Sequence, residues 1–153
     1  MTISINEMTG DTARLVAGLE AKCFSDPWPY ESFINTLANE HAQYYTIHRD
    51  YAFVGYIGMY NLIDEVSIIN VAIEPAYRGT GYGRMLMERA EDFAKNHGCP
   101  MITLEVRESN TPARRLYEVC GYQAYAVQKN YYTNPKEDAV LYRKAVNRLG
   151  MRN

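Results

Sequence analysis

Residues 74–86 read EPAYRGTGYGRML, and this stretch decides how the rest of the chain is interpreted. Glycines at every second position lie between two arginines, in the set Arg78, Gly79, Gly81, Gly83 and Arg84. The first turn of a helix leaves backbone N–H groups without partners, and glycines before it let the chain wrap closely around an anion. The stretch therefore predicts a phosphate or pyrophosphate site with arginines at its rim. Glycines that serve only a tight turn are the alternative.

The spacing of these glycines excludes two familiar nucleotide loops. The P-loop pattern G-x-x-x-x-G-K-[ST] needs Lys-Ser or Lys-Thr, and the chain contains neither. The dinucleotide pattern G-x-G-x-x-G would require glycine where Arg84 or Leu86 stands. The pattern that does fit is R-x-x-G-x-G at 78–83, directly after a strand-like segment and a Glu-Pro turn.

Length and composition predict one globular domain spanning residues 1–153. The chain has 153 residues, of which 47% are hydrophobic and 22% charged, with a net charge of -2. This charge argues against a specific nucleic-acid partner. Residues from about 144 to 153 are basic and are expected to form a flexible tail, with contact to ribosomal RNA as a weaker alternative.

Neither a membrane segment nor a metal site is expected. The first twenty residues are interrupted by charges, and no window approaches roughly 18 uninterrupted apolar residues, so we expect a cytoplasmic protein without a membrane partner. Cys23, Cys99 and Cys120 lack C-x-x-C spacing and are interpreted as small buried hydrophobes in a reducing compartment. The three histidines are scattered, so no metal is predicted.

Hydrophobic periodicity and turn residues predict eleven elements in the order β-α-α-β-β-β-α-β-α-β-β. They are expected near Ile3–Ile5, 11–24, 30–37, 43–49, 52–62, 66–73, 84–97, 101–106, 109–121, 123–132 and 139–145. This order predicts an α/β protein with a mixed, mostly antiparallel sheet of about six or seven strands and helices on both faces. Right-handed crossover makes the strands flanking helix 84–97 parallel neighbours, so the glycine loop lies at the carboxyl end of a central strand, where such sheets bind ligands.

The spacing of apolar residues also predicts which helix faces are buried. In helix 11–24 the inner face is expected to carry Leu15, Val16, Leu19 and Cys23. In helix 30–37 it is expected to carry Phe33, Ile34 and Leu37, and in helix 109–121 Ala113, Leu116, Tyr117 and Cys120.

The R-x-x-G-x-G loop and the element order together resemble the GCN5-related N-acetyltransferases (GNAT), over nearly the entire chain. In that family the loop binds the pyrophosphate of acetyl-CoA. The resemblance therefore implies the GNAT fold and acetyl-CoA as cosubstrate. The loop residues implied in cofactor binding are Arg78, Gly79, Thr80, Gly81, Tyr82, Gly83 and Arg84.

Two residues beyond the loop have open interpretations from position alone. Glu105 lies on the less apolar face of strand 101–106, where an unpaired carboxylate is costly unless it is near water. It is either a structural carboxylate paired with Arg107 or Arg114, or a general base at a cleft. Tyr117, taken alone, is interpreted as an aromatic packing residue with a satisfied hydroxyl group.

The segments 104–122 and 129–142, LEVRESNTPARRLYEVCGY and KNYYTNPKEDAVLY, are similar to the RimI type of this family, the ribosomal-protein-alanine N-acetyltransferases. The resemblance implies that Glu105 is the proton acceptor and Tyr117 the proton donor. It also implies that Asn110 contacts the cofactor. Segment NVAI matches the strand that lines the acetyl-pantetheine arm, which implies cofactor contacts at Val71, Ala72 and Ile73. Cys120 could be an acetyl carrier, but its helical spacing from Tyr117 more simply makes it core.

Further matches concern the groove for the acceptor. CFSDPWPYESF (23–33) resembles the F-x-x-P-W-x-x-x-x-F segment that borders the peptide groove in RimI-type enzymes, with Trp28 as its tryptophan. Trp28 either borders this groove or anchors a loop. Pro29 replaces the usual serine or threonine, which removes a helix cap.

Tyr131 and Tyr132 match the far wall of the groove, with ordinary strand packing as the alternative. With Asp64 and Glu65 they would make a narrow acidic slot for a flexible cationic N-terminus. The sequence therefore predicts transfer of acetyl from acetyl-CoA to the N-terminal α-amine of a protein, most directly a ribosomal protein. A GNAT enzyme acting on lysine ε-amines, polyamines or another small amine is the first alternative. A non-catalytic acyl-CoA-binding or partner-docking module is the second.

Overall fold

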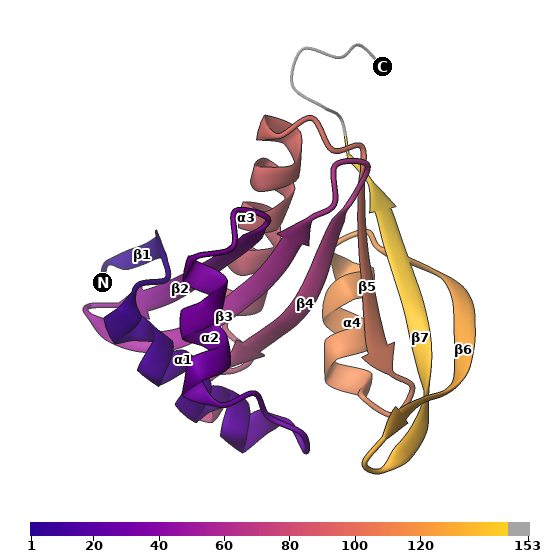
Figure 1. Ribbon diagram of the computed structural model, residues 1–153, viewed down its shortest axis with the longest axis horizontal. Coiled ribbons are helices and arrows are strands. Elements are labelled where there is room, and N and C mark those ends of the chain that lie inside the picture. Colours follow the sequence, from indigo (N-terminus) through magenta and orange to yellow (C-terminus); the bar gives the residue numbers. More distant parts are fainter. Residues whose placement is uncertain (147–153) are drawn as a thin grey trace.

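A computed structural model describes residues 1–146 as a seven-stranded sheet with helices on both faces (Figure 1). The strands are Ile3–Glu7 (β1), Ala42–Arg49 (β2), Ala52–Asn61 (β3), Val66–Ile73 (β4), Met101–Arg107 (β5), Gln123–Thr133 (β6) and Lys136–Ala145 (β7). The helices are Gly10–Cys23 (α1), Tyr30–Leu37 (α2), Tyr82–Asn96 (α3) and Thr111–Val119 (α4), with a 3-10 turn, η1, at Pro75–Tyr77. Apart from η1, this order is the one predicted from the sequence.

The sheet has the order β1-β2-β3-β4-β5-β7-β6, and β4 occupies its centre. Among the described strands, β4 and β5 are parallel and each other neighbouring pair is antiparallel. Helix α3 connects the parallel pair, as the crossover rule requires. The glycine loop therefore follows the carboxyl end of the central strand.

Two apolar clusters lie on opposite faces of the sheet. One contains the inner residues of α3 and α4, among them Leu86 and Tyr117, and the other contains those of α1 and α2, among them Leu19 and Phe33. Along β5 the side chains alternate, so that Ile102, Leu104 and Val106 join the first cluster. Glu105 therefore points to the opposite face from Tyr117.

The parallel pair separates after a short ladder. Strands β4 and β5 pair through Val66–Ile102, Ser67–Thr103 and Ile68–Leu104. Beyond Leu104, β5 continues only with β7, while β4 continues with β3 as far as Ile73. Figure 1 shows the two strands side by side at one end and diverging toward the other. The sheet is thus open beside the carboxyl half of β4, and Glu105 is the first residue of β5 past the last pair.

Details of the helices and of the C-terminal segment differ from the sequence predictions. Leu15 and Leu37 are 45% and 47% exposed, because the inner faces of their helices are rotated toward Ala13 in α1 and Thr36 in α2. Helix α3 begins two residues earlier than expected, directly after Gly81. Residues 144 and 145, included in both the predicted strand and the predicted tail, belong to β7, and residues 147–153 lie outside the described part of the chain.

Candidate active site

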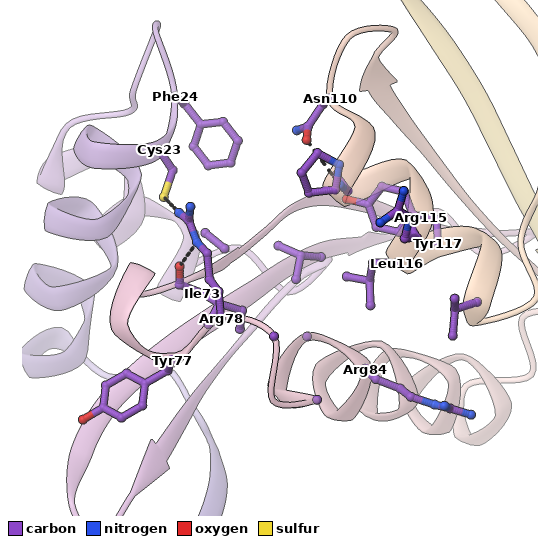
Figure 2. Close-up of a pocket in the computed structure, with 18 residues that line it drawn as sticks. Cys23, Phe24, Ile73, Tyr77, Arg78, Arg84, Asn110, Arg115, Leu116 and Tyr117 are labelled. Carbon is purple, nitrogen blue, oxygen red and sulfur yellow. Dashed lines mark hydrogen bonds between the residues drawn. The ribbon is translucent and has the colours of Figure 1, made fainter.

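A cleft of about 720 Å³ lies where β4 and β5 separate, between the end of β4, the glycine loop and α4 (Figure 2). Of the residues implied in cofactor binding or catalysis, those that line it are Val71, Ala72, Ile73, Arg78, Gly79, Gly81, Gly83, Arg84, Asn110 and Tyr117. The structure thus brings together the glycine loop, the strand before it and the inner face of α4, although they span nearly fifty residues of sequence.

The glycine loop has a backbone that only glycine adopts readily. Gly79 and Gly81 have φ angles of 80° and 94°, in the left-handed region. Gly81 is the N-cap of α3 and makes no side-chain cap hydrogen bond. The N–H groups of the first turn of α3 therefore face the cleft unsatisfied by any cap, which is the arrangement that binds anions. The Thr80 hydroxyl group donates to the Tyr77 carbonyl at 2.8 Å, and neither Thr80 nor the buried ring of Tyr82 lines the cleft.

Gly83 has a second role that the sequence analysis did not predict. A Cβ atom at this position would lie 3.1 Å from Leu116 Cδ2 and 3.9 Å from Ile73 Cγ1. The missing side chain therefore allows α3 to approach α4 and β4 closely. Gly83 therefore lets these elements pack closely at the cleft wall and also keeps a side chain away from the N-terminus of α3.

Arginines surround the cleft at its rim. Arg78 donates from Nε to the Ile73 carbonyl at 3.0 Å, and its Nη2 lies 3.2 Å from Cys23 Sγ, so its guanidinium turns toward α1 (Figure 2). Arg84 extends along α3, and Arg115 adds a third guanidinium from α4. The neighbouring Arg114 points elsewhere, to the Tyr142 hydroxyl group at 3.1 Å. The cleft thus carries positive charge where a pyrophosphate or a 3′-phosphate would bind.

Asn110 lies at the start of α4 and both caps this helix and lines the cleft. Its Oδ1 accepts from the Ala113 N–H at 3.2 Å, as an N-cap residue does. Its Nδ2 group has no partner within residues 1–146 and remains available to a ligand. The cofactor contact implied by the resemblance is compatible with this geometry.

Tyr117 forms part of the cleft floor. Its side chain is only 6% exposed, and its hydroxyl group makes no hydrogen bond to the described residues. Burial, aided by Tyr132 and Cys120, raises the pKa of Tyr117 well above its usual range. The phenol therefore keeps its proton at neutral pH and has it free to donate.

Glu105 lies at the separation of β4 and β5 and is exposed on its strand face. The ion pairs considered from the sequence are absent within the described residues, because Arg107 pairs with Glu137 and Arg114 bonds to Tyr142. Partial desolvation raises the pKa of Glu105 above its usual value, although a hydrogen bond to its own backbone opposes this, and the like charge of Glu65 adds to the rise. Glu105 is thus a carboxylate without a cation, open to a ligand.

Tyr132 connects Glu105 with Tyr117 electrostatically. Burial, followed by the influence of Tyr131 and Glu105, raises the pKa of Tyr132 to about 12. Glu105 likewise adds to the raised pKa of Tyr131, after burial. Tyr132 is therefore coupled to the Glu105 carboxylate and in turn contributes to the raised pKa of the Tyr117 phenol.

The remaining residues suggested for the acceptor are distributed more widely. Trp28 does not line the cleft; it packs on Phe33 with ring centroids 5.8 Å apart and borders a separate hollow of about 270 Å³ that also includes Tyr60. Asp64 faces Cys99, where it adds to the effect of burial in raising the pKa of the thiol. Pro29 is the N-cap of α2 and makes no side-chain cap bond, as the sequence predicted.

The sequence analysis missed part of the cleft lining. The missed residues are Cys23, Phe24, Tyr77, Pro112, Ala113, Arg115, Leu116 and Val119. The missed residues of α4 lie on or beside the face of this helix that the sequence predicted to be buried. Their proximity to the cleft follows once α4 is placed beside the glycine loop. Cys23 and Phe24 come from the other end of the chain, and no local signal connects them with the loop.

Within residues 1–146, the structure has no group of three or more His, Cys, Asp or Glu side chains placed to hold a metal ion. In the same part of the chain, no helix is both long enough and apolar enough to cross a membrane.

The fold and the cleft define a class of protein: a mixed α/β protein with a cleft where two parallel strands separate and with a glycine loop and a helix N-terminus at its edge. Residues 14–122 match the model of the Acetyltransferase (GNAT) family, and the chain belongs to this family of acyltransferases.

Individual relatives agree with this class. A Bacillus subtilis protein provisionally named a ribosomal protein bS18-alanine N-acetyltransferase is 40% identical over 124 residues, which cover 80% of this chain and 82% of the relative. The crystal structure of the ribosomal-protein-S18-alanine N-acetyltransferase from Escherichia coli superposes with a TM-score of 0.86 at 25% identity, covering 99% of each chain. Arabidopsis thaliana NAA60 in complex with acetyl-CoA has the same fold, with a TM-score of 0.83 at 16% identity, covering 95% of this chain and 99% of NAA60.

Proposed function

We propose that this chain transfers the acetyl group of acetyl-CoA to the N-terminal α-amine of a protein in the cytoplasm, most directly a ribosomal protein. The observation that carries the proposal is a single cleft lined at one end by the anion-binding loop and at the other by the free hydroxyl group of Tyr117. The names of the Bacillus subtilis and Escherichia coli relatives support a ribosomal protein with an N-terminal alanine as acceptor.

The cleft fits coenzyme A in both its polar and its extended part. The N–H groups at the start of α3 and the guanidinium groups of Arg78, Arg84 and Arg115 are suited to its phosphates. Past Ile68, β4 has no pairing with β5, so one edge of Val71–Ile73 is open to an amide-containing arm. Such an arm would add to β4 like a short strand and lead from the loop toward Tyr117.

The proposed mechanism is direct transfer, with no covalent enzyme intermediate. Glu105 removes a proton from the α-ammonium group, whose reference pKa of about 7.7–8.0 leaves it mostly protonated at neutral pH. The neutral nitrogen forms a bond to the thioester carbon, the carbon–sulfur bond breaks, and the nitrogen releases its second proton to solvent as the amide forms. Tyr117 donates its proton to the departing thiolate, and the proton held by Glu105 returns through solvent to restore the phenol.

The acceptor would enter on the side of Glu105. Neither Glu65 nor Glu105 forms an ion pair within the described residues, and the charge of Glu105 contributes to the raised pKa values of Tyr131 and Tyr132. This surface favours a cationic amine. A lysine ε-amine, with a reference pKa of about 10.4, is a poorer match, because far less of it is neutral at the working pH.

Peptide acetylation tests the proposed function. We expect thiol release when the purified protein is mixed with acetyl-CoA and peptides beginning with Ala, Ser or Met, and at least about tenfold lower kcat/KM with an N-terminally blocked lysine peptide. Turnover confined to the blocked peptide or to polyamines would instead favour the small-amine alternative. Measurable acetyl-CoA binding with no turnover on any amine would make the chain a non-catalytic binding module.

Replacing Gly81 by alanine tests the loop. We expect the Gly81→Ala variant to bind acetyl-CoA about tenfold more weakly, because a φ of 94° costs an L-residue about 1–2 kcal/mol and the N–H donors shift as the strain relaxes. Isothermal titration calorimetry measures this Kd. The matched control is Gly98→Ala, which has φ of 69° and equally open space but lies at the other end of α3. Equal weakening in both variants would show that the effect is general destabilisation.

A further inference from the structure

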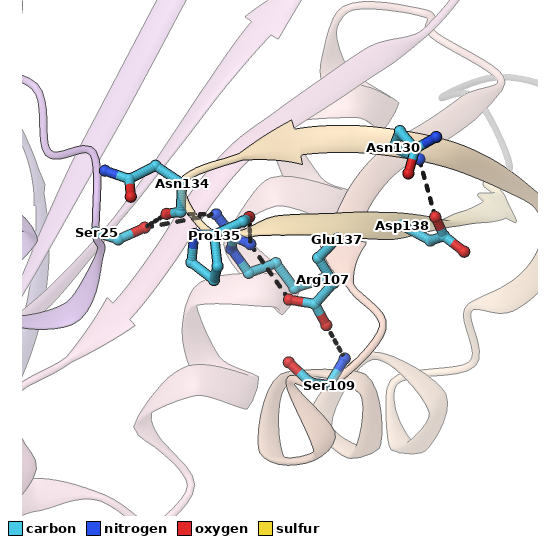
Figure 3. Close-up of polar contacts among 8 residues, drawn as sticks. All are labelled: Ser25, Arg107, Ser109, Asn130, Asn134, Pro135, Glu137 and Asp138. Carbon is cyan, nitrogen blue, oxygen red and sulfur yellow. Dashed lines mark hydrogen bonds and ion pairs between the residues drawn. The ribbon is translucent and has the colours of Figure 1, made fainter.

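Arg107, two residues beyond Glu105 on β5, joins segments that are far apart in the sequence (Figure 3). Its Nη1 donates to the Pro135 carbonyl at 2.8 Å and to Glu137 Oε1 at 3.2 Å. Its Nη2 donates to the Asn134 carbonyl at 3.1 Å and lies 3.4 Å from Ser25 Oγ. One guanidinium group thus contacts both the turn between β6 and β7 and the loop between α1 and α2.

These two loops also form hydrogen bonds directly with each other, next to Arg107. The Ser25 hydroxyl group donates to the Asn134 carbonyl, so this carbonyl accepts from both Ser25 and Arg107. The Asn134 Nδ2 group donates to Asp26 Oδ1 at 3.0 Å. We call these contacts of Ser25, Asp26, Asn134 and Arg107 the loop junction. It fixes the distance between two segments that no strand pairing holds together.

The planar shape of arginine is needed for this arrangement. The guanidinium lies over the Tyr132 ring, 4.3 Å from its centroid, while its edges reach two carbonyls and a carboxylate. Lysine has a single point charge and no plane to stack, so it cannot replace all of these contacts. Glu137 is held in turn by the Ser109 N–H at 2.6 Å, and both ionic side chains are mostly buried, at 23% and 18% exposure.

The junction controls the acceptor side of the site. Arg107 stacks on Tyr132, whose pKa is raised in part by Glu105 and which in turn contributes to the raised pKa of Tyr117. Trp28 follows Ser25 by three residues, and its backbone N–H donates to the buried carboxylate of Glu20. No residue of the junction lines the cofactor cleft. Loss of Arg107 would therefore loosen both walls of the acceptor groove, while the glycine loop and α4, which supply most of the donor-site lining, make no contact with the junction.

We propose that Arg107 is a positioning residue for the acceptor peptide: it holds the α1–α2 loop and the β6–β7 turn at a fixed separation and orients Tyr132 beside Glu105. This role rests on the proposed function, because it assumes that a peptide N-terminus enters between these walls. It is separate from the proton transfers assigned to Glu105 and Tyr117. Its signature is a change in acceptor KM at unchanged acetyl-CoA affinity.

Arg107→Met and Arg107→Lys test the role kinetically, with the same peptide that begins with Ala. We expect Arg107→Met to raise the peptide KM at least about tenfold, with kcat within about threefold and the acetyl-CoA Kd within about twofold of wild type. Arg107→Lys keeps the charge and the aliphatic stem, which favours folding. Its peptide KM should nevertheless remain closer to that of Arg107→Met than to that of wild type. The matched controls are Arg143→Met and Arg143→Lys: Arg143 stacks on Tyr125 at 4.5 Å in the same hairpin but contacts neither loop.

The chain's single tryptophan supplies a readout that does not depend on catalysis. Trp28 lies in the α1–α2 loop, so quenching of its fluorescence by acrylamide should increase in both Arg107 variants and stay at the wild-type level in both Arg143 variants. If the wild type is active but neither Arg107 substitution changes the peptide KM, or neither changes the quenching of Trp28, the positioning role is overturned and the proposed function stands. A wild type that binds acetyl-CoA but acetylates no peptide overturns the proposed function, and this role with it.

Discussion

Replacing Tyr117 with phenylalanine should lower kcat by about 100-fold or more, because the departing thiolate would then have no proton donor at the cleft floor. The aromatic ring remains, so the packing of Tyr117 against Tyr122 and Tyr142 is retained. The acetyl-CoA Kd should therefore be close to that of wild type. Steady-state kinetics with a peptide acceptor, together with calorimetric titration of acetyl-CoA, measure the two quantities.

Tyr122→Phe is the matched control for this variant. Tyr122 is a neighbouring buried tyrosine, with ring centroids 6.4 Å from Tyr117, but it does not line the cleft. Its hydroxyl group has no partner among the described residues, so its removal should leave kcat unchanged and should not lower Tm. Equal loss of kcat in both variants, or none in Tyr117→Phe, would remove Tyr117 as the acid.

Glutamine at position 105 should lower kcat/KM at neutral pH by about tenfold, since the amide cannot accept the proton of the α-ammonium group and only about a tenth of the amine is neutral at pH 7. The effect also has a pH signature. In wild type, activity rises as pH increases through the raised pKa of Glu105 and is then sustained, because the carboxylate can use the ammonium form. In Glu105→Gln only neutral amine reacts, so the rise moves up to the amine pKa of about 7.7–8.0.

The Glu65→Gln variant tests whether the acidic limb of the kcat/KM profile reports the pKa of Glu105. The negative charge of Glu65 contributes to the raised pKa of Glu105, after desolvation. Its removal favours the ionised form of Glu105, so the acidic limb of kcat/KM should move to lower pH. A pH profile that is the same in wild type and Glu105→Gln would show that another group, or solvent alone, removes the proton.

Much of the fold could be predicted from local patterns. The order of strands and helices, the parallel neighbours around α3 and the exact range of α2 follow from periodicity, turn residues and the handedness of crossovers. The errors lie where neighbouring elements determine burial. Leu15 and Leu37 are apolar but exposed, because the direction from which the sheet approaches a short helix decides which side is covered.

The candidate site likewise has one part that could be predicted from the sequence and one that could not. The glycine loop is a contiguous segment, so its positive φ angles and its place before a helix could be read directly from residues 78–83. The surroundings of Glu105 could not. Both ion pairs considered for it involve arginines nearby in sequence, yet Arg107 turns to Glu137 and Arg114 to Tyr142.

The sequence by itself determined the glycine loop before α3 and the topology that brings it to the end of the central strand. These depend on backbone preferences and on contacts that are local or follow from strand order. Only the tertiary structure decided that β4 and β5 separate at Glu105, that Arg107 stacks on Tyr132, and that Arg107 joins Ser25 to Asn134. Such contacts join segments up to about a hundred residues apart, and their geometry is set by how the whole sheet twists and packs, which no short stretch of sequence encodes.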